Sequence, residues 1–158
     1  MSKGTVKTNA MRILEREKIS FVSHEYDPSV TDGTKVAETL GQDPKKVFKT
    51  LVTEAAGPLY FVFVIPVGET LDLKKAARAA GQKSLSMLKQ KELFPLTGYV
   101  HGGCSPIGMK KLFPTFIHES AAELDLFCVS AGRVGCQAEL SPTDIARVTR
   151  ARFADLTV

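Results

Sequence analysis

The chain has 158 residues, of which 44% are hydrophobic and 24% charged, and its 21 basic and 17 acidic side chains give a formal net charge of +4. This length and composition are those of one ordinary globular domain, and they exclude disordered, collagen-like and coiled-coil chains. The mild positive charge permits an anionic partner without requiring one.

Cap and turn residues divide the first half of the chain into short elements. In chain order we predict a helix capped by Thr8, a strand over 21–26, a helix over 35–40, a helix start at Asp43-Pro44, and strands over 47–54 and 59–65. The stretch Ala55-Ala56-Gly57-Pro58 fits a hairpin loop between the last two strands.

The second half continues with interspersed helices and strands. We predict a helix over 73–80 between Asp72 and Gly81, a helix over 84–94 ended by Pro95, strands over 99–101, 115–118, 126–130 and 136–140, and a helix over 143–150. Strict strand–helix alternation is absent and several connections have hairpin length. The pattern therefore predicts a single α+β domain over residues 1–158, with a mixed sheet and peripheral helices.

Cysteine usage and hydropathy indicate a cytoplasmic protein. Cys104, Cys128 and Cys136 are an odd number without a C-x-x-C pair, which favours free thiols over disulfides or a zinc ribbon. The N-terminus lacks the apolar segment of a secretory signal, and the longest apolar run, from Leu59 to Ile65, is too short to span a bilayer. We therefore expect a soluble chain with no membrane partner.

Most familiar catalytic patterns are missing. The chain has no H-E-x-x-H, G-x-S-x-G or nucleotide-binding glycine motif, and no two of its histidines have metal-ligand spacing. We expect His24 and His118 to be structural. Cys104 could act as a nucleophile only with a base to lower its pKa, and His101 is the nearest candidate in sequence. No metal or organic cofactor is expected.

Two features remain as candidates for a site. Gly102-Gly103 lies in the densest loop signal of the chain and, if it is not merely a tight turn, would let a ligand approach the backbone closely. Its N–H groups could then donate to a carbonyl oxygen. Lys49 lies in an otherwise apolar strand, where its ammonium either reaches solvent or faces an anion or a cavity.

Several stretches, in order along the chain, resemble a known family. They are residues 7–12, His24-Glu25-Tyr26, Val47-Phe48-Lys49-Thr50-Leu51-Val52, residues 71–77, the fifteen residues 97–111 around the Gly-Gly loop, Val129-Ser130-Ala131-Gly132, and residues 151–155. Together they make residues 5–156 similar to the YbaK/EbsC-type aminoacyl-tRNA deacylases, which are related to the editing insertion domain of bacterial prolyl-tRNA synthetases.

The resemblance implies a freestanding enzyme that removes cysteine from mischarged Cys-tRNA(Pro), on a bent mixed sheet that forms a pseudo-barrel with helices around it. The cysteine thiol of the substrate would attack its own ester and release a thiolactone, with attack by an activated water as the competing route. The implied partners are the acceptor end of tRNA(Pro) and, in a ternary complex, prolyl-tRNA synthetase; no DNA is implied.

Roles carried over from the family fall on particular residues. Lys49 would contact the terminal adenosine or the reacting ester, and the loop at Gly102 and Gly103, next to His101, would hold the carbonyl. Ser130 would line the pocket, and Tyr26 would wall the cysteine side chain; a turn former and an ordinary core residue are the alternative interpretations of these two.

The chain departs from the family pattern at two places. Val134 stands where relatives have a basic residue, and the loop after Asp27 is short. The short loop keeps a deacylase for another mischarged tRNA, such as Ala-tRNA(Pro), as an alternative. A non-catalytic tRNA- or synthetase-binding module is the alternative of another class.

Overall fold

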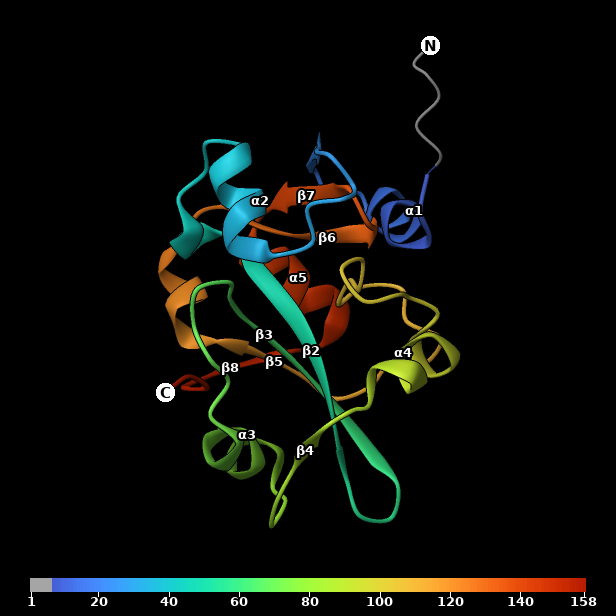
Figure 1. The fold of residues 1–158 in the computed structure, drawn as a ribbon, viewed down its shortest axis with the longest axis vertical. Helices are drawn as coiled ribbons and strands as arrows, with labels where there is room; N and C mark the ends of the chain where they lie inside the picture. Colours follow the sequence, from blue (N-terminus) through green and yellow to red (C-terminus); the bar gives the residue numbers. More distant parts are fainter. Residues whose placement is uncertain (1–6) are drawn as a thin grey trace.

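The computed structural model describes residues 7–158, and within that range eight strands divide between two sheets (Figure 1). A three-stranded antiparallel sheet has the order β1-β7-β6, and a five-stranded mixed sheet has the order β4-β2-β3-β5-β8. The strands are β1 (Val22–Glu25), β2 (Phe48–Ala55), β3 (Leu59–Pro66), β4 (Ser86–Met87), β5 (Thr115–His118), β6 (Phe127–Arg133), β7 (Cys136–Leu140) and β8 (Arg152–Ala154). Residues 1–6, which the single-domain prediction includes, lie outside the described range.

Short helices surround the sheets. They are α1 (Asn9–Arg16), α2 (Gly33–Thr39), α3 (Leu73–Ala80), α4 (Gln90–Thr97) and α5 (Pro142–Thr149), with 3₁₀ helices η1 (Pro44–Lys46) and η2 (Glu119–Glu123). Helices α1 and α2 lie at the end of the molecule that holds β6 and β7, and α3 lies at the opposite end (Figure 1). Among the described helices, each is too short or too polar to cross a bilayer.

The two sheets meet where β2 begins. Val47 forms a parallel bridge with Cys128, and the rings of Phe48 and Phe127 pack edge to face with their centroids 5.0 Å apart. The prediction of a mixed α+β domain is confirmed. In place of one bent sheet, the described strands form two sheets joined at this point, and they do not close into a barrel.

Local signals predicted several elements correctly. The β2–β3 hairpin pairs from Phe48 and Pro66 down to Ala55 and Leu59, on either side of the predicted loop. At α3, the Asp72 carboxylate accepts hydrogen bonds from the first-turn N–H groups, and Gly81 ends the helix in the left-handed region with φ 69°. Cap chemistry explains both helix ends because it satisfies backbone groups that lack intrahelical partners.

The predicted helix over 84–94 is wrong over 84–89 and correct over 90–94. Its first part extends along β2: Leu85 is buried in the core, β4 pairs with β2, and the N–H of Leu88 donates to the carbonyl of Val52. The helix α4 starts later and includes Pro95. Pairing with a free sheet edge thus outweighs helix propensity over the first part. Pro95 is tolerated in α4 because it is exposed, and water can reach the carbonyl four residues earlier that the proline leaves without an N–H partner.

The predicted strand over 99–101 is also wrong. The N–H of Tyr99 donates to the hydroxyl of Thr97, and the Tyr99 hydroxyl donates to the carbonyl of Ile107 at 2.6 Å. These bonds close the segment into a loop, so its backbone does not pair with a strand. The short strand β8, parallel to β5, was not predicted because three residues carry too little alternation to be recognised.

Candidate active site

A cavity of about 180 Å³ lies between the two sheets. Its wall comes from β2, β6 and β7, from the segment between Tyr26 and Val36, and from the glycine loop after α4. Apolar side chains, including Val47, Phe48 and Val129, provide most of its lining, and a small set of polar groups interrupts them. This composition is typical of small-molecule sites, in which a few polar groups orient a ligand held by apolar walls.

The cavity exists because one edge of β2 is open there. That edge is paired at Val47, which bridges to Cys128, and again at Val52, whose carbonyl accepts from Leu88. Backbone groups two residues apart in a strand point the same way. The N–H and C=O of Thr50 therefore point to the open edge between these two pairings, toward the cavity.

Five of the six predicted site residues line this cavity: Tyr26, Lys49, His101, Gly102 and Ser130. Segments that are more than 100 residues apart in sequence supply them. The sixth, Gly103, is buried behind the loop, and its N–H donates to the carbonyl of Val100 at 2.9 Å. That N–H is therefore occupied, whereas no hydrogen bond within residues 7–158 uses the N–H of Gly102.

Lys49 is half-buried at the cavity wall. Within residues 7–158 its ammonium forms no ion pair and no hydrogen bond with a side chain or carbonyl. A partly buried cation without a partner costs free energy that an anionic or strongly polar ligand would recover. Its position at the cavity wall is one that a bound ligand could contact.

Ser130 is oriented by its own turn. Its hydroxyl oxygen accepts from the N–H of Gly132 at 3.2 Å, which leaves the hydroxyl proton free to donate. Tyr26 lies just beyond β1, and its N–H donates to the carbonyl of Gly135 at 3.0 Å. Burial raises the pKa of the Tyr26 phenol above its ordinary value, so it is neutral at physiological pH.

The cavity contains polar groups that sequence reasoning missed. Thr50 lines it, and its hydroxyl oxygen is buried without a hydrogen-bond partner in the described part of the chain. Gln137, 3% exposed, lines it from β7 and accepts a hydrogen bond from Gln42. Alternation in β7 separates Gln137 from the apolar face that carries Cys136 and Ala138, and this was the available signal.

The segment after Asp27 completes the cavity through Thr31 and Gly33. A Cβ at Gly33 would lie 2.5 Å from a methyl carbon of Val67, so a larger residue cannot occupy this position without moving that side chain. Thr31 and Val134 both lie against Gly102, within 3.7 Å of where its Cβ would be. Val134, where the family resemblance predicts a basic residue, is thus an apolar wall of the glycine loop.

The remaining basic residue of that turn is paired. Arg133 Nη2 lies 3.0 Å from Oε2 of Glu25, which neutralises much of its charge at the surface. The turn beside the cavity therefore presents little free positive charge, and Lys49 is the cation that lines the cavity itself.

Cys104 lines the cavity but is not an activated nucleophile. Burial raises the pKa of its thiol to about 12, with a hydrogen bond to Thr97 as the smaller opposing influence. A catalytic cysteine needs the opposite, a pKa lowered by a base or a positive field.

All three thiols of the folded protein should be unreactive toward Ellman's reagent. Burial raises the pKa of Cys104 and of Cys128 to about 12 and also raises that of Cys136. The fraction of thiolate at neutral pH is then about 1000-fold lower for the first two than for an ordinary thiol. We expect three reactive thiols only after denaturation; rapid reaction of one thiol in the native protein would contradict this.

Replacing Gly103 with alanine should destabilise the fold. A Cβ there would lie 2.7 Å from the backbone N of Val134 and 2.9 Å from the backbone C of Arg133, so a main chain must move. We expect a loss of about 1–3 kcal/mol in the free energy of unfolding, measured by urea denaturation. Gly68→Ala is the matched control, because nothing lies within 4 Å of that Cβ. Equal stability of the two variants would contradict the tight packing.

Comparison with known proteins gives consistent matches. Residues 27–148 match the family model for the aminoacyl-tRNA editing domain. A relative from Enterococcus faecalis, named "Putative Cys-tRNA(Pro)/Cys-tRNA(Cys) deacylase EbsC", is 46% identical over 155 residues, which cover 96% of this chain and 93% of the relative.

Two solved structures share the fold. One is titled "Crystal structure of a putative trans-editing enzyme for prolyl tRNA synthetase"; it has a TM-score of 0.83 and 24% identity, over 98% of this chain and 99% of that one. The other is described only as a hypothetical protein, with a TM-score of 0.88 and 19% identity over 96% and 100% of the two chains.

Proposed function

Because the chain belongs to the aminoacyl-tRNA editing domain family, we propose that it is a deacylase that removes cysteine from mischarged Cys-tRNA(Pro). The observation that carries the proposal is the cavity at the open edge of β2. It combines the unpaired Lys49 ammonium with donor groups at Ser130 and Gly102. Cys104, the thiol that lines it, is not activated as a nucleophile.

The size of the cavity suits a small aminoacyl group. Its volume of about 180 Å³ is below the ~300–1,000 Å³ of sites for drug-sized ligands. The aminoacyl group would therefore fill the cavity, and the terminal ribose and phosphate would lie at its open side. A synthetase pocket that holds proline discriminates poorly against the similarly sized cysteine, which is why a second, hydrolytic or cyclising site is useful.

The proposed chemistry takes its nucleophile from the substrate. The cysteine thiol attacks its own ester carbonyl; a C–S bond forms, the C–O bond to the ribose breaks, and the thiol proton passes to the departing ribose oxygen. A four-membered thiolactone and free tRNA leave the site. Hydrolysis by an activated water would give free cysteine instead. In either route the protein orients the reactants and stabilises the developing oxyanion.

The cavity residues divide this task. We assign Lys49 to the charge that develops on the ester or to the terminal phosphate, and the N–H of Gly102 and the hydroxyl of Ser130 to the carbonyl oxygen. Tyr26 would pack against the cysteine side chain, and His101, exposed beside the glycine loop, would contact the incoming ribose.

The partner of the reaction is the acceptor end of an aminoacyl-tRNA, and the reaction belongs in the cytoplasm, where tRNA is charged. The name of the Enterococcus relative includes both Cys-tRNA(Pro) and Cys-tRNA(Cys). A chain that accepts both would destroy correctly charged tRNA, so we propose that bound prolyl-tRNA synthetase restricts it to tRNA(Pro).

The test is deacylation of Cys-tRNA(Pro) beside Ala-tRNA(Pro) and Cys-tRNA(Cys) at substoichiometric enzyme. Rapid loss of cysteine from tRNA(Pro), with alanine retained, is the expected result. Preferential loss of alanine would move the assignment to another mischarged tRNA, and no turnover with retained tRNA binding would indicate a binding module. Identification of thiolactone or free cysteine among the products distinguishes the two chemical routes.

A further inference from the structure

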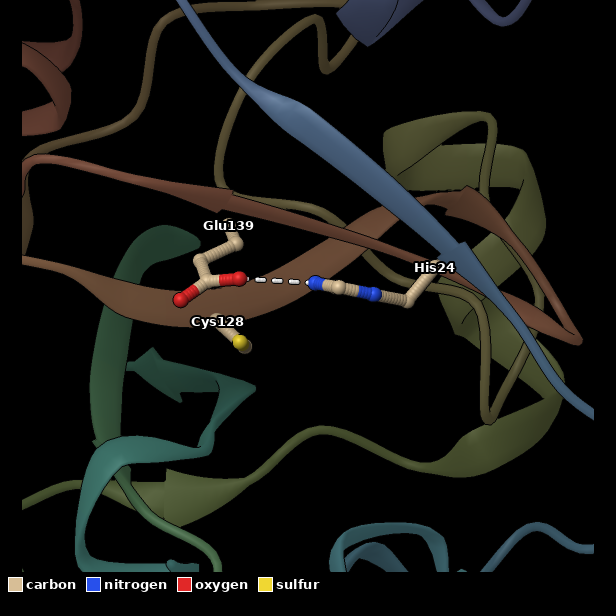
Figure 2. A group of neighbouring side chains, drawn as sticks. All are labelled: His24, Cys128 and Glu139. Carbon is tan, nitrogen blue, oxygen red and sulfur yellow. Dashed lines mark hydrogen bonds and ion pairs between the residues drawn. The ribbon is translucent and has the colours of Figure 1, made fainter. Parts of the chain in front are cut away.

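Three side chains of types that can bind a metal ion come from three adjacent strands and meet on one face of the smaller sheet. His24 lies on β1, Glu139 on β7 and Cys128 on β6, and one ligand atom from each lies within 4.8 Å of the other two. Figure 2 shows the imidazole and the carboxylate directed at each other, with Nε2 and Oε1 2.7 Å apart, and the thiol beside them. Imidazole, thiolate and carboxylate are the side-chain ligands that zinc takes in proteins. We propose that this group binds one zinc ion.

The sheet itself holds the three residues together. Cys128 is directly opposite Glu139 in the β6–β7 register, and His24 is opposite Gln137, two residues from Glu139. Because side chains two residues apart share a face, all three ligands point to the same side. Ligand atoms around tetrahedral zinc are ~3.3–3.8 Å apart, from bonds of about 2.0–2.3 Å. The wider separations in the group, up to 4.8 Å, must therefore shorten by about 1.0–1.5 Å, and the 2.7 Å Nε2–Oε1 separation must lengthen by about 0.6 Å. Side-chain rotation can supply both changes.

A fourth donor lies next to this group. The side-chain nitrogen of Gln42 is 3.7 Å from the sulfur of Cys128, and its amide oxygen is buried with no hydrogen-bond partner in the described part of the chain. A buried carbonyl oxygen without a partner is costly, and a bound ion or an ion-bound water would satisfy it. Rotation of the Gln42 amide, which breaks its hydrogen bond to Gln137, would bring this oxygen to the sulfur side and complete a four-coordinate site.

The site is reachable from solvent. A hollow of about 240 Å³ is lined by the three ligands and Gln42, and the side chains of His24 and Glu139 are 30% and 33% exposed. Asp43 and Lys46 also line it. The carboxylate of Asp43 favours a cation there, and the long stem of Lys46 allows its ammonium to turn toward solvent.

The donor set selects a borderline or soft ion over a hard one. Magnesium and calcium take oxygen ligands, whereas a thiolate with an imidazole favours zinc. On binding, the thiol of Cys128 loses its proton to solvent, and His24 coordinates through Nε2 with its ring proton on Nδ1. The His24–Glu139 hydrogen bond is exchanged for two bonds to the ion.

The ion would act as a structural clamp beside the cavity rather than in it. The hollow at the proposed zinc ligands and the cavity at β2 have one lining residue in common, Val47. Each proposed ligand lies two residues along the chain from a cavity-lining side chain, namely Tyr26, Ser130 or Gln137. Joining the three strands at one ion would therefore restrain that wall of the cavity.

The test is titration of metal-free protein with ZnCl₂ in competition with a chromophoric chelator. We expect one ion per chain, and Co²⁺ in its place should give a thiolate-to-metal charge-transfer band. Cys128→Ala should remove that band and weaken zinc binding by at least about 10–100-fold, the loss that even an outer-shell substitution causes. Cys136→Ala is the matched control, a buried cysteine of the same sheet that lies outside the group.

A second variant, Glu139→Gln, covers the case in which Cys128→Ala fails to fold. The Glu139 side chain is partly exposed, so we expect this substitution to be tolerated by the fold. Zinc should raise the melting temperature of the wild type and of Cys136→Ala but not of either ligand variant. No stoichiometric binding by the wild type, or equal binding by wild type and Glu139→Gln, would overturn the proposal. None of these measurements uses deacylation, so they are independent of the proposed function.

Discussion

Lys49→Ala is expected to lower the rate of Cys-tRNA(Pro) deacylation by about 100- to 1000-fold, the range found when one preorganised charge-stabilising donor is removed. The ammonium is half-buried at the cavity wall and has no partner within residues 7–158, so its charge is available to the substrate. The same lack of partners means that removing it breaks no ion pair of the folded protein. Urea denaturation should therefore show little loss of stability.

Two further lysine variants separate charge from packing. Lys49→Met keeps an unbranched apolar stem without the ammonium, and it should be as inactive as the alanine variant. Lys83→Ala removes an exposed lysine that follows α3 and does not line the cavity, and it should retain full activity. Single-turnover rates at saturating enzyme measure the chemical step directly. Full activity of Lys49→Met would assign the lysine a packing role and contradict the proposed mechanism.

Elements with strong local signals were predictable from sequence, and those decided by distant partners were not. Asp72 and Gly81 delimit α3 because capping chemistry acts within one turn. The stretch before α4 was wrongly predicted as helix. Its extended conformation depends on pairing with Val52, which lies more than 30 residues earlier in the sequence. No local pattern records whether a sheet edge is free, so the edge pairing could not be anticipated.

The same distinction applies to the two sites. The position of Lys49 at the cavity could be predicted, because a lysine between apolar residues of one strand stands out in the sequence. The unpartnered hydroxyl of Thr50 could not be predicted from the sequence. Whether a buried hydroxyl has a hydrogen-bond partner depends on how the molecule packs. The group of His24, Cys128 and Glu139 has no recognisable metal spacing, and only the register of three strands places it together.

Sheet alternation also explains why the two sites are neighbours. A proposed zinc ligand and a cavity residue lie two residues apart, and so on the same face, in β6 and in β7, and His24 of β1 stands in the same relation to Tyr26 just beyond that strand. A change that shifted one strand by a single residue would move the zinc ligand and the cavity residue of that strand to the other face. The isolated bridge between Val47 and Cys128 lies between the two sites and holds β2 in the matching position.

Thr50→Val is expected to change stability and activity in opposite directions. The buried hydroxyl has no hydrogen-bond partner in the described part of the chain, and an unsatisfied buried polar group costs about 1–3 kcal/mol. A methyl group of the same shape removes this cost and keeps the β-branched side chain that suits a strand. The free energy of unfolding should therefore rise by about 1 kcal/mol, at the lower end of that range.

We also assign the unpartnered Thr50 hydroxyl at the cavity wall to the oxygen that gains charge in the reaction. Deacylation by Thr50→Val should then fall by about 10- to 100-fold, because one hydrogen bond to such a group contributes about 1.5–3 kcal/mol and each 1.4 kcal/mol is tenfold in rate. Thr53→Val is the matched control on the same strand. Its hydroxyl is fully buried and donates to the carbonyl of Phe61 at 3.1 Å, so this variant should lose about 1 kcal/mol of stability. It should also retain activity, because Thr53 does not line the cavity.

Urea denaturation and single-turnover deacylation of both variants test whether the Thr50 hydroxyl serves the substrate or the fold. A Thr50→Val protein that is less stable and fully active would show that the hydroxyl belongs to the fold and not to the substrate site.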